Sequence, residues 1–157
     1  MPDMLVKLYN LPDSKPFYDK VAARNVRIFR PMTPNRDKVL KWIEERFGIG
    51  WSNEIPAAFT KSPVSCFIAY DTEKKEILGF AGYDCTAPDY FGPIGVAVEA
   101  RKGGIGGASL IACLEALREE GYGYAIIGGA GPVDYYKKVC GAEVIEGSIP
   151  GIYKDLI

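Results

Sequence analysis

The sequence predicts a single α+β domain in which helices cover a mixed, mostly antiparallel sheet. Several short runs alternate apolar and polar residues, the period of a half-buried strand. Two of these runs are joined by a charged connector, which favours an antiparallel hairpin. A strand, a glycine turn, a helix and another strand form one βαβ unit with parallel neighbours. With 157 residues, 48% of them apolar, the chain can bury one compact core.

Residues 1–24 are set apart from the domain predicted over residues 25–157. Residues 5–9 alternate in the manner of a strand, and the turn-rich stretch 12–16 follows. This pattern predicts an N-terminal arm or an added edge strand.

The domain is predicted to begin with a strand at residues 25–30, which Pro31 ends. A helix follows, because Thr33 is a capping residue and Pro34 suits the first helical position. Apolar residues recur at helical spacing until Gly48: Val39, Leu40, Trp42, Ile43 and Phe47. Residues 50–63 are mixed, with a short helix expected at 54–60, and suit a segment beside a binding cleft.

Residues 64–70 and 77–83 are predicted strands of the hairpin, with the charged connector 71–76 as its tip. Residues 91–98 predict the next strand. Gly92, Pro93 and Gly95 interrupt it, which indicates a bulge or an edge that a ligand approaches.

The rest of the chain predicts a helix at 108–120, a strand at 125–127 and a short helix at 132–139. Two final strands are expected at 142–145 and 152–157. The last of them is apolar, and we expect it to lie on a second copy in a homodimer.

The glycine-rich turn Arg101-Lys102-Gly103-Gly104-Ile105-Gly106-Gly107 is the most informative stretch. Glycines let the backbone approach a phosphate closely, and the first N–H groups of a helix have no intrahelical partner. The helix dipole adds positive potential at the same place. The turn therefore predicts a site for a phosphorylated ligand.

Two common phosphate motifs do not fit this turn. A P-loop needs a lysine followed by serine or threonine after its last glycine, and neither is present here. A dinucleotide fingerprint would have glycine or alanine where Ser109 stands, and no acidic residue ends a second strand at the usual distance.

Charge and cysteine usage narrow the function further. Lysine and arginine number 19 against 20 acids, so the net charge of −1 gives no general attraction to nucleic acid or to an anionic membrane. The four cysteines are widely spaced and histidine is absent, so no metal site is expected. The N-terminus does not resemble a signal peptide, which predicts a cytoplasmic protein with reduced thiols.

The absence of histidine also restricts catalysis. It excludes Ser-His-Asp and Cys-His mechanisms, so a general acid or base must be a carboxylate, tyrosine, lysine, cysteine or water. Cys140 is expected to be a small buried thiol and not a nucleophile, because no histidine activates it.

Two motifs in order resemble the GNAT acetyltransferase superfamily. Arg101, Gly104 and Gly106 match its R-x-x-G-x-G signature after the strand-like residues 94–100, and residues 135–142 resemble its F-Y-x-K-x-G-F segment with one extra residue. The resemblance covers residues 25–157. Gly129 stands where the family often has asparagine, and Ala142 replaces a phenylalanine.

The resemblance implies a central sheet of about six to seven strands, flanked by about four helices and splayed in the middle for CoA. It implies acetyl-CoA as co-substrate, with no metal. Its pyrophosphate would bind the turn and its pantetheine arm would follow residues 94–98, the Val96 N–H polarising the thioester carbonyl. The implied cofactor residues are Ile94, Val96, Val98, Arg101, Lys102, Gly103, Gly104, Ile105, Gly106, Gly107 and Ala108.

The resemblance assigns Tyr136 the role of general acid toward the departing thiolate, while Tyr135 is expected to pack. The acceptor would be the primary amine of a small molecule or peptide, attacking directly in a ternary complex. The base stays open among the carboxylates Glu54, Asp84, Asp89 and Glu99, and a water relay would need none of them. Trp51 fits an acceptor pocket nearly as well as packing.

Two other classes of protein remain alternatives. A GNAT-like domain that holds acyl-CoA as a sensor or scaffold would not need the tyrosine acid. A purely structural interaction protein would not bind CoA at all.

Overall fold

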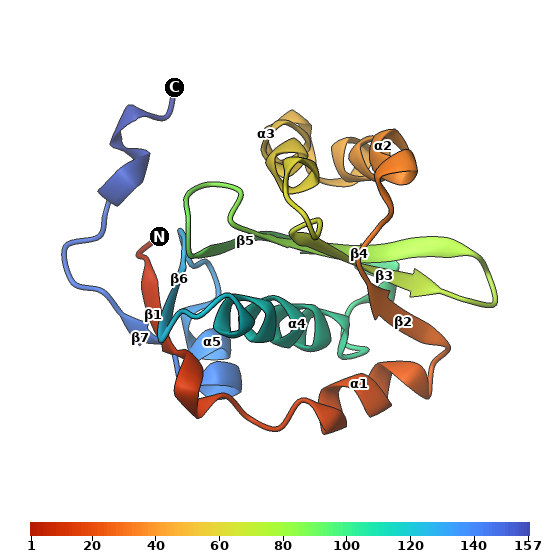
Figure 1. The fold of residues 1–157 in the computed structure, drawn as a ribbon, viewed down its shortest axis with the longest axis horizontal. Coiled ribbons are helices and arrows are strands. Elements are labelled where there is room, and N and C mark those ends of the chain that lie inside the picture. Colours follow the sequence, from red (N-terminus) through yellow and green to blue (C-terminus); the bar gives the residue numbers. More distant parts are fainter.

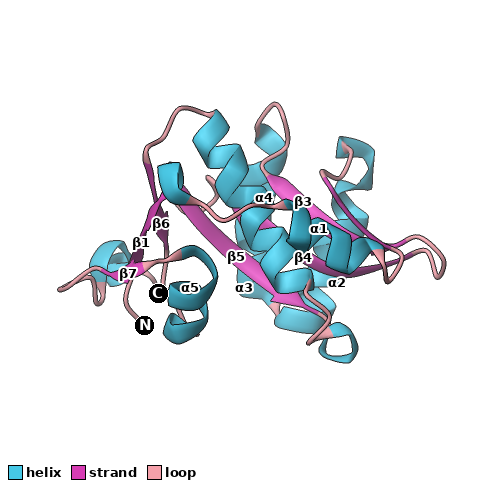
Figure 2. Ribbon diagram, turned by 90° about the horizontal axis from the view of Figure 1, so that it is seen from below, coloured by secondary structure: helices cyan, strands magenta, loops and turns pink.

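The computed structural model describes residues 1–157 as a seven-stranded sheet with helices on both faces (Figures 1 and 2). The strand order is β2-β3-β4-β5-β6-β1-β7, and only β5 and β6 are parallel neighbours. The strands are β1 Met4–Lys7, β2 Val26–Phe29, β3 Cys66–Asp71, β4 Glu76–Tyr83, β5 Tyr90–Val96, β6 Tyr124–Ile127 and β7 Glu143–Val144. The predicted mixed, mostly antiparallel sheet is confirmed.

Five α-helices flank this sheet: α1 Lys15–Ala22, α2 Arg36–Phe47, α3 Ile49–Glu54, α4 Ile105–Glu119 and α5 Val133–Cys140. Helices α2 and α3 lie on one face, and α1, α4 and α5 lie on the other (Figure 1). The short helix expected at 54–60 is the 3₁₀ segment Ile55–Thr60, which continues α3. No helix has both the length and the apolarity needed to cross a bilayer.

Two glycines let helices approach the middle of the sheet closely. A Cβ on Gly79 of β4 would lie 3.0 Å from Ile105 at the start of α4, on one face. A Cβ on Gly95 of β5 would lie 2.7 Å from the ring of Phe47, on the other face. The glycines therefore place the start of α4 and the α2–α3 aromatics directly against β4 and β5.

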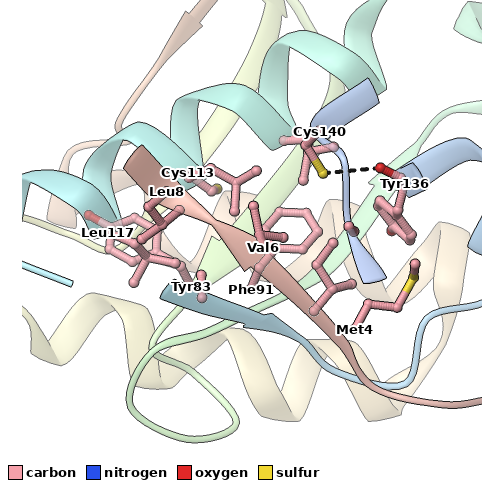
Figure 3. Packing of buried hydrophobic residues seen from close by; sticks show 14 of the residues in the cluster. Met4, Val6, Leu8, Tyr83, Phe91, Cys113, Leu117, Tyr136 and Cys140 are labelled. Atoms are coloured by element: carbon pink, nitrogen blue, oxygen red, sulfur yellow. Dashed lines mark hydrogen bonds between the residues drawn. The ribbon is translucent and has the colours of Figure 1, made fainter. Parts of the chain in front are cut away.

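The N-terminal residues are part of the sheet and of its core. Strand β1 pairs antiparallel with β6 on one side and with β7 on the other, so it is not an edge strand. Met4, Val6 and Leu8 are fully buried and belong to the largest apolar cluster, with Phe91 and Tyr136 (Figure 3). The alternation in residues 5–9 indicates the strand correctly, but its place between two other strands depends on the tertiary fold.

The strand predicted at 152–157 is wrong. Residues Gly151–Asp155 form a 3₁₀ turn, and Gly151 has a φ of +60°, which does not suit a strand. The apolar side chains of Ile152, Leu156 and Ile157 are exposed and do not pair with the sheet. The expected homodimer rested on this predicted strand, and the structure gives no such strand to support it.

Candidate functional site

The sheet opens between its two parallel strands. Strand β5 pairs with β6 only at Tyr90 and Phe91, and β6 ends at Ile127. Further along β5, the Ala97 N–H donates to Leu78 of β4, so in an antiparallel ladder the N–H and C=O groups of Ile94 and Val96 point the other way, into the opening. This is the splayed sheet that the resemblance implies.

A cavity of about 790 Å³ occupies this opening and runs from the glycine turn to the aromatic side chains of α3 and α5. Its walls come from the α1 face, the α2–α3 face, β5 and α5, so it reaches through the opening in the sheet. The lining residues are Pro16, Phe17, Lys20, Phe47, Trp51, Ile94, Gly95, Val96, Ala100, Arg101, Lys102, Gly104, Ile105, Gly106, Gly107, Pro132, Tyr135, Tyr136 and Val139.

The glycine turn ends three residues earlier than predicted, because α4 begins at Ile105 and not at Ala108. The Ala108 N–H donates to the Gly104 carbonyl at 3.0 Å and the residue is fully buried, so it is not available to a phosphate. The unpaired N–H groups of the helix are those of residues 104–107. Positive φ angles of +66° at Lys102 and +88° at Gly104 turn the chain sharply into them.

Two other predicted cofactor residues, Val98 and Gly103, lie outside the cavity, whereas Arg101 lines it. Val98 lies outside the cavity, because β5 ends at Val96 and Val98 is 73% exposed in a 3₁₀ turn. Gly103 is buried and does not line the cavity. Arg101 lines it and also donates from Nε to the Val96 carbonyl at 3.2 Å.

Two basic residues of the N-terminal segment lie against the turn, and the sequence analysis missed them. A Cβ on Gly104 would stand 2.9 Å from Cδ of Lys20, and a Cβ on Gly103 would overlap the Arg24 guanidinium. Neither residue, nor Arg101 or Lys102, takes part in an ion pair. Three cations without acidic partners, Lys20, Arg101 and Lys102, therefore line the cavity at the turn, and Arg24 lies behind Gly103. The four-residue spacing of Lys20 and Arg24 was the only sequence signal.

Removing these charges tests the anion site. We expect Lys20→Gln and Arg24→Gln each to weaken CoA binding about three- to tenfold at low ionic strength, and less at high ionic strength because salt screens exposed charges. Calorimetry at two salt concentrations measures this. Lys74→Gln, in the exposed turn between β3 and β4, is the matched control and should bind CoA as the wild type does. If all three variants bound CoA with the affinity of the wild type, the anion site would be contradicted.

Tyr136 reaches the cavity from α5. Its ring is 5% exposed and packs edge-on against Phe91, with centroids 6.3 Å apart. The Tyr136 hydroxyl makes no hydrogen bond within the protein and is not fully buried. Because Tyr136 lines the cavity, we place its hydroxyl at the cavity surface. Burial raises the pKa of Tyr136 to about 12, and the neighbouring Tyr135 and Cys140 contribute less. The hydroxyl is therefore a neutral donor at any physiological pH.

Tyr135, expected to pack, lies at the phosphate end of the same cavity. It is 39% exposed, and its hydroxyl would be 3.3 Å from a Cβ on Gly107 and 3.7 Å from one on Gly106. The two tyrosine rings pack edge-on with centroids 5.7 Å apart, and their outer contacts differ, because Tyr135 faces the glycine turn and Tyr136 packs on Phe91. Tyr135 is placed near the unpaired N–H groups, and Tyr136 is placed at the deeper, apolar end.

The four candidate carboxylates do not meet at one place. Glu99 is 66% exposed at its side chain and lies 3.8 Å from Arg46. Glu54 ends α3 and accepts a hydrogen bond from Thr86. Asp84 and Asp89 belong to the β4–β5 loop, where the Asp84 carboxylate accepts from the Asp89 N–H at 2.7 Å. None of the four lines the cavity.

Asp84 and Asp89 form an acidic cluster with Glu120. Burial, and then the charge of Asp84, raises the pKa of Asp89 to about 6. Partial desolvation, and then the hydrogen bond and charge of Asp84, raises the pKa of the largely exposed Glu120 to about 7. Both values lie above those of an unfolded chain, so the folded state loses stability as the pH rises through this range.

Asp84→Asn should reduce that loss. The variant keeps an oxygen for the Asp89 N–H and removes one charge, so we expect its melting temperature to fall less than that of the wild type between pH 5 and pH 8. Thermal unfolding at both pH values measures it. Asp155→Asn, on the exposed C-terminal turn, should follow the wild type. Parallel curves for all three proteins would show that the cluster does not destabilise the fold.

A sheet that splays beside a glycine-rich helix N-terminus defines the class: the protein has the GNAT fold. A region described as a GCN5-related glucosamine N-acetyltransferase, in a fungal multi-domain GH3 β-N-acetylglucosaminidase, superposes with a TM-score of 0.75 and 13% identity, over 92% of this chain and 19% of that one. A GCN5-related N-acetyltransferase from Sphaerobacter thermophilus gives 0.71 and 18%, over 92% and 48%.

A conserved Staphylococcus epidermidis protein of unknown function has the same fold, with a TM-score of 0.54 and 15% identity over 92% of this chain and 57% of that one. The chain thus spans from about a fifth to somewhat over half of these solved chains. No protein-family profile and no curated protein sequence matches it. No group of three metal-ligating side chains is close enough to hold an ion.

Proposed function

We propose that the protein is an N-acetyltransferase that moves an acetyl group from acetyl-CoA to a primary amine. One observation carries the proposal: a single cavity joins the unpaired N–H groups of the α4 N-terminus to the Tyr136 hydroxyl along the unpaired edge of β5. Phosphates fit the first end, with Lys20 and Arg24 beside it, and a thioester fits the second. Strand β5 runs between the two ends, and its unpaired N–H and C=O groups face the cavity.

The reaction is direct attack on the thioester. The amine nitrogen forms a bond to the carbonyl carbon, the carbon–sulfur bond breaks, and its electron pair leaves on sulfur. The Val96 N–H faces the opening and would donate to the carbonyl oxygen as negative charge develops there. The Tyr136 hydroxyl would protonate the departing sulfur, and the proton that the amine loses to water would return through water to the tyrosine.

An acyl-enzyme on Cys140 has no support. Its Sγ donates to the Tyr136 carbonyl at 3.3 Å, and burial raises the pKa of the thiol to about 11 (Figure 3). The thiolate is the nucleophilic form, and it is scarce at neutral pH for such a group. Transfer in a ternary complex needs no such intermediate.

A thiol-release assay with acetyl-CoA and a panel of amines tests the function. Glucosamine is the first amine to include, because a solved region named for its acetylation has this fold. Acceleration of thiol release by at least one amine, with Tyr136→Phe much slower, is the expected result. CoA binding without acceleration by any amine, and with no effect of Tyr136→Phe, would favour the sensor or scaffold alternative instead.

A further inference from the structure

A second group of polar side chains lies at the closed end of the opening, on the α3 face of the sheet. Gly128 directly follows β6, and there the position of a Cβ would overlap the Tyr153 hydroxyl and lie 3.0 Å from the Tyr90 ring. Tyr153 comes from the C-terminal turn, which rises on the same side of the sheet as α2 and α3 (Figure 1). The two tyrosines therefore meet where β5 and β6 stop pairing.

Helix α3 leads from the cavity to this group. Trp51 lines the cavity and is 37% exposed, with its ring against Phe47 and Phe80. Glu54 is three residues further, one turn along the same helix, and accepts the hydroxyl hydrogen bond of Thr86. The carboxylate is thus held in place by Thr86, one helical turn from Trp51 and outside the residues that line the cavity.

The group carries negative charge without a basic partner. Burial, then the charges of Asp3 and Glu54, raises the pKa of Tyr153 to about 12, so both carboxylates act on one hydroxyl. Neither carboxylate takes part in an ion pair. Asp3 is 4% exposed and accepts from the Gly129 N–H at 2.8 Å, which ties the N-terminus to the turn after β6.

The C-terminal turn is fastened to this place by the same residue. The Asp3 N–H donates to the Ser148 hydroxyl at 2.8 Å, and that hydroxyl donates to the Ile145 carbonyl at 2.6 Å. The segment that leads to Tyr153 is therefore tied to the N-terminal residues.

We propose that Glu54, with the hydroxyls of Thr86 and Tyr153, forms the acceptor subsite, and that the acceptor is a small hydroxylated amine of the amino-sugar kind. This rests on the proposed transferase function. The carboxylate suits the ammonium form in which an amine arrives, and that ammonium passes one proton to water before its nitrogen attacks. The hydroxyls both donate and accept, as sugar hydroxyls require, and the exposed face of Trp51 suits the apolar face of a sugar ring. Amines that carry a carboxylate are repelled by Asp3 and Glu54.

Amine kinetics test the subsite. We expect Glu54→Gln to raise the KM for glucosamine about tenfold or more, with kcat changed much less and with unchanged CoA affinity, because a charged hydrogen bond is lost in binding. The glutamine keeps an acceptor for Thr86, and thermal unfolding checks that the variant is folded. Glu73→Gln, in the exposed β3–β4 turn, is the matched control and should keep the wild-type KM.

Tyr153→Phe tests the hydroxyl contact separately. It should raise the KM for glucosamine about three- to tenfold and leave the KM for cyclohexylamine unchanged, because only the sugar offers hydroxyls. Tyr9→Phe, on an exposed ring far along the sheet, is its control. A wild-type preference for glutamate over glucosamine, or a Glu54→Gln enzyme that matches Glu73→Gln, would overturn the subsite.

Calorimetric titration of glucosamine into the CoA complex separates the two proposals. Thiol release that responds to amines but not to Glu54→Gln leaves the transferase function intact and removes the subsite. Glu54-dependent binding of glucosamine without thiol release supports the subsite and removes the transferase function. The absence of both binding and release removes both.

Discussion

A Gly106→Ala variant is expected to fold as well as the wild type and to bind CoA at least about 30-fold more weakly, a loss of roughly 2 kcal/mol. The added Cβ would lie 3.7 Å from the Tyr135 hydroxyl and 3.9 Å from Val96, which are ordinary contacts. It would nonetheless project into the cavity beside the unpaired N–H groups. A phosphate would be held away from those donors and lose charge-assisted hydrogen bonds.

The effect on stability should have the opposite sign. Gly106 is in the first turn of α4, and alanine in a helix is favoured over glycine by up to about 1 kcal/mol. Melting temperature should stay equal or rise while calorimetry shows weaker CoA binding. Gly123→Ala, where a Cβ meets nothing within 4 Å, is the control and should leave affinity unchanged. Unaltered CoA binding by the Gly106 variant would place the phosphates elsewhere.

Tyr136→Phe is expected to lower kcat about 100-fold or more, the usual effect of losing a positioned general acid, with CoA affinity unchanged. The hydroxyl has no partner in the protein, so its loss should cost little stability. Steady-state thiol release and CoA calorimetry measure the two parts. Tyr135→Phe is the matched comparison: its hydroxyl is at the phosphate end, so it should weaken CoA binding and leave kcat nearly unchanged.

The pH profile gives a second test of Tyr136. Because burial raises the pKa of its hydroxyl to about 12, the proton stays in place between pH 8 and pH 10. Between pH 8 and pH 10, the kcat of the wild type should therefore change with pH in the same way as the kcat of Tyr136→Phe. Such a decrease, with a midpoint near pH 9 to 10, would indicate a tyrosine that ionises freely and would contradict the buried donor.

The sequence patterns predicted most of the sheet because strand and helix periods are local properties. The alternation of Val26 and Ile28 and the hairpin runs at 64–70 and 77–83 correspond to β2, β3 and β4. The start of α4 was placed too late, since Gly106 and Gly107 have low helix propensity. Burial of Ile105 against β4 supplies the compensating contact, and that contact is not local.

The C-terminal error has a similar origin. Ile152, Leu156 and Ile157 have the composition of a strand, but a strand needs a neighbour with free hydrogen-bonding groups. β1 already lies between β6 and β7, with partners on both sides. The C-terminal segment instead forms a turn that brings Tyr153 to Gly128.

By itself the sequence predicted a phosphate site: glycines before a helix, an interrupted strand before them and a tyrosine on the next helix. Only the tertiary structure decided which N–H groups of that helix are unpaired, that Lys20 and Arg24 lie against the turn, and that Tyr153 contacts Gly128 at the end of β6. The physical reason is range. Propensity and turn chemistry act between near neighbours, whereas packing joins residues a hundred positions apart, and the cavity depends on that packing.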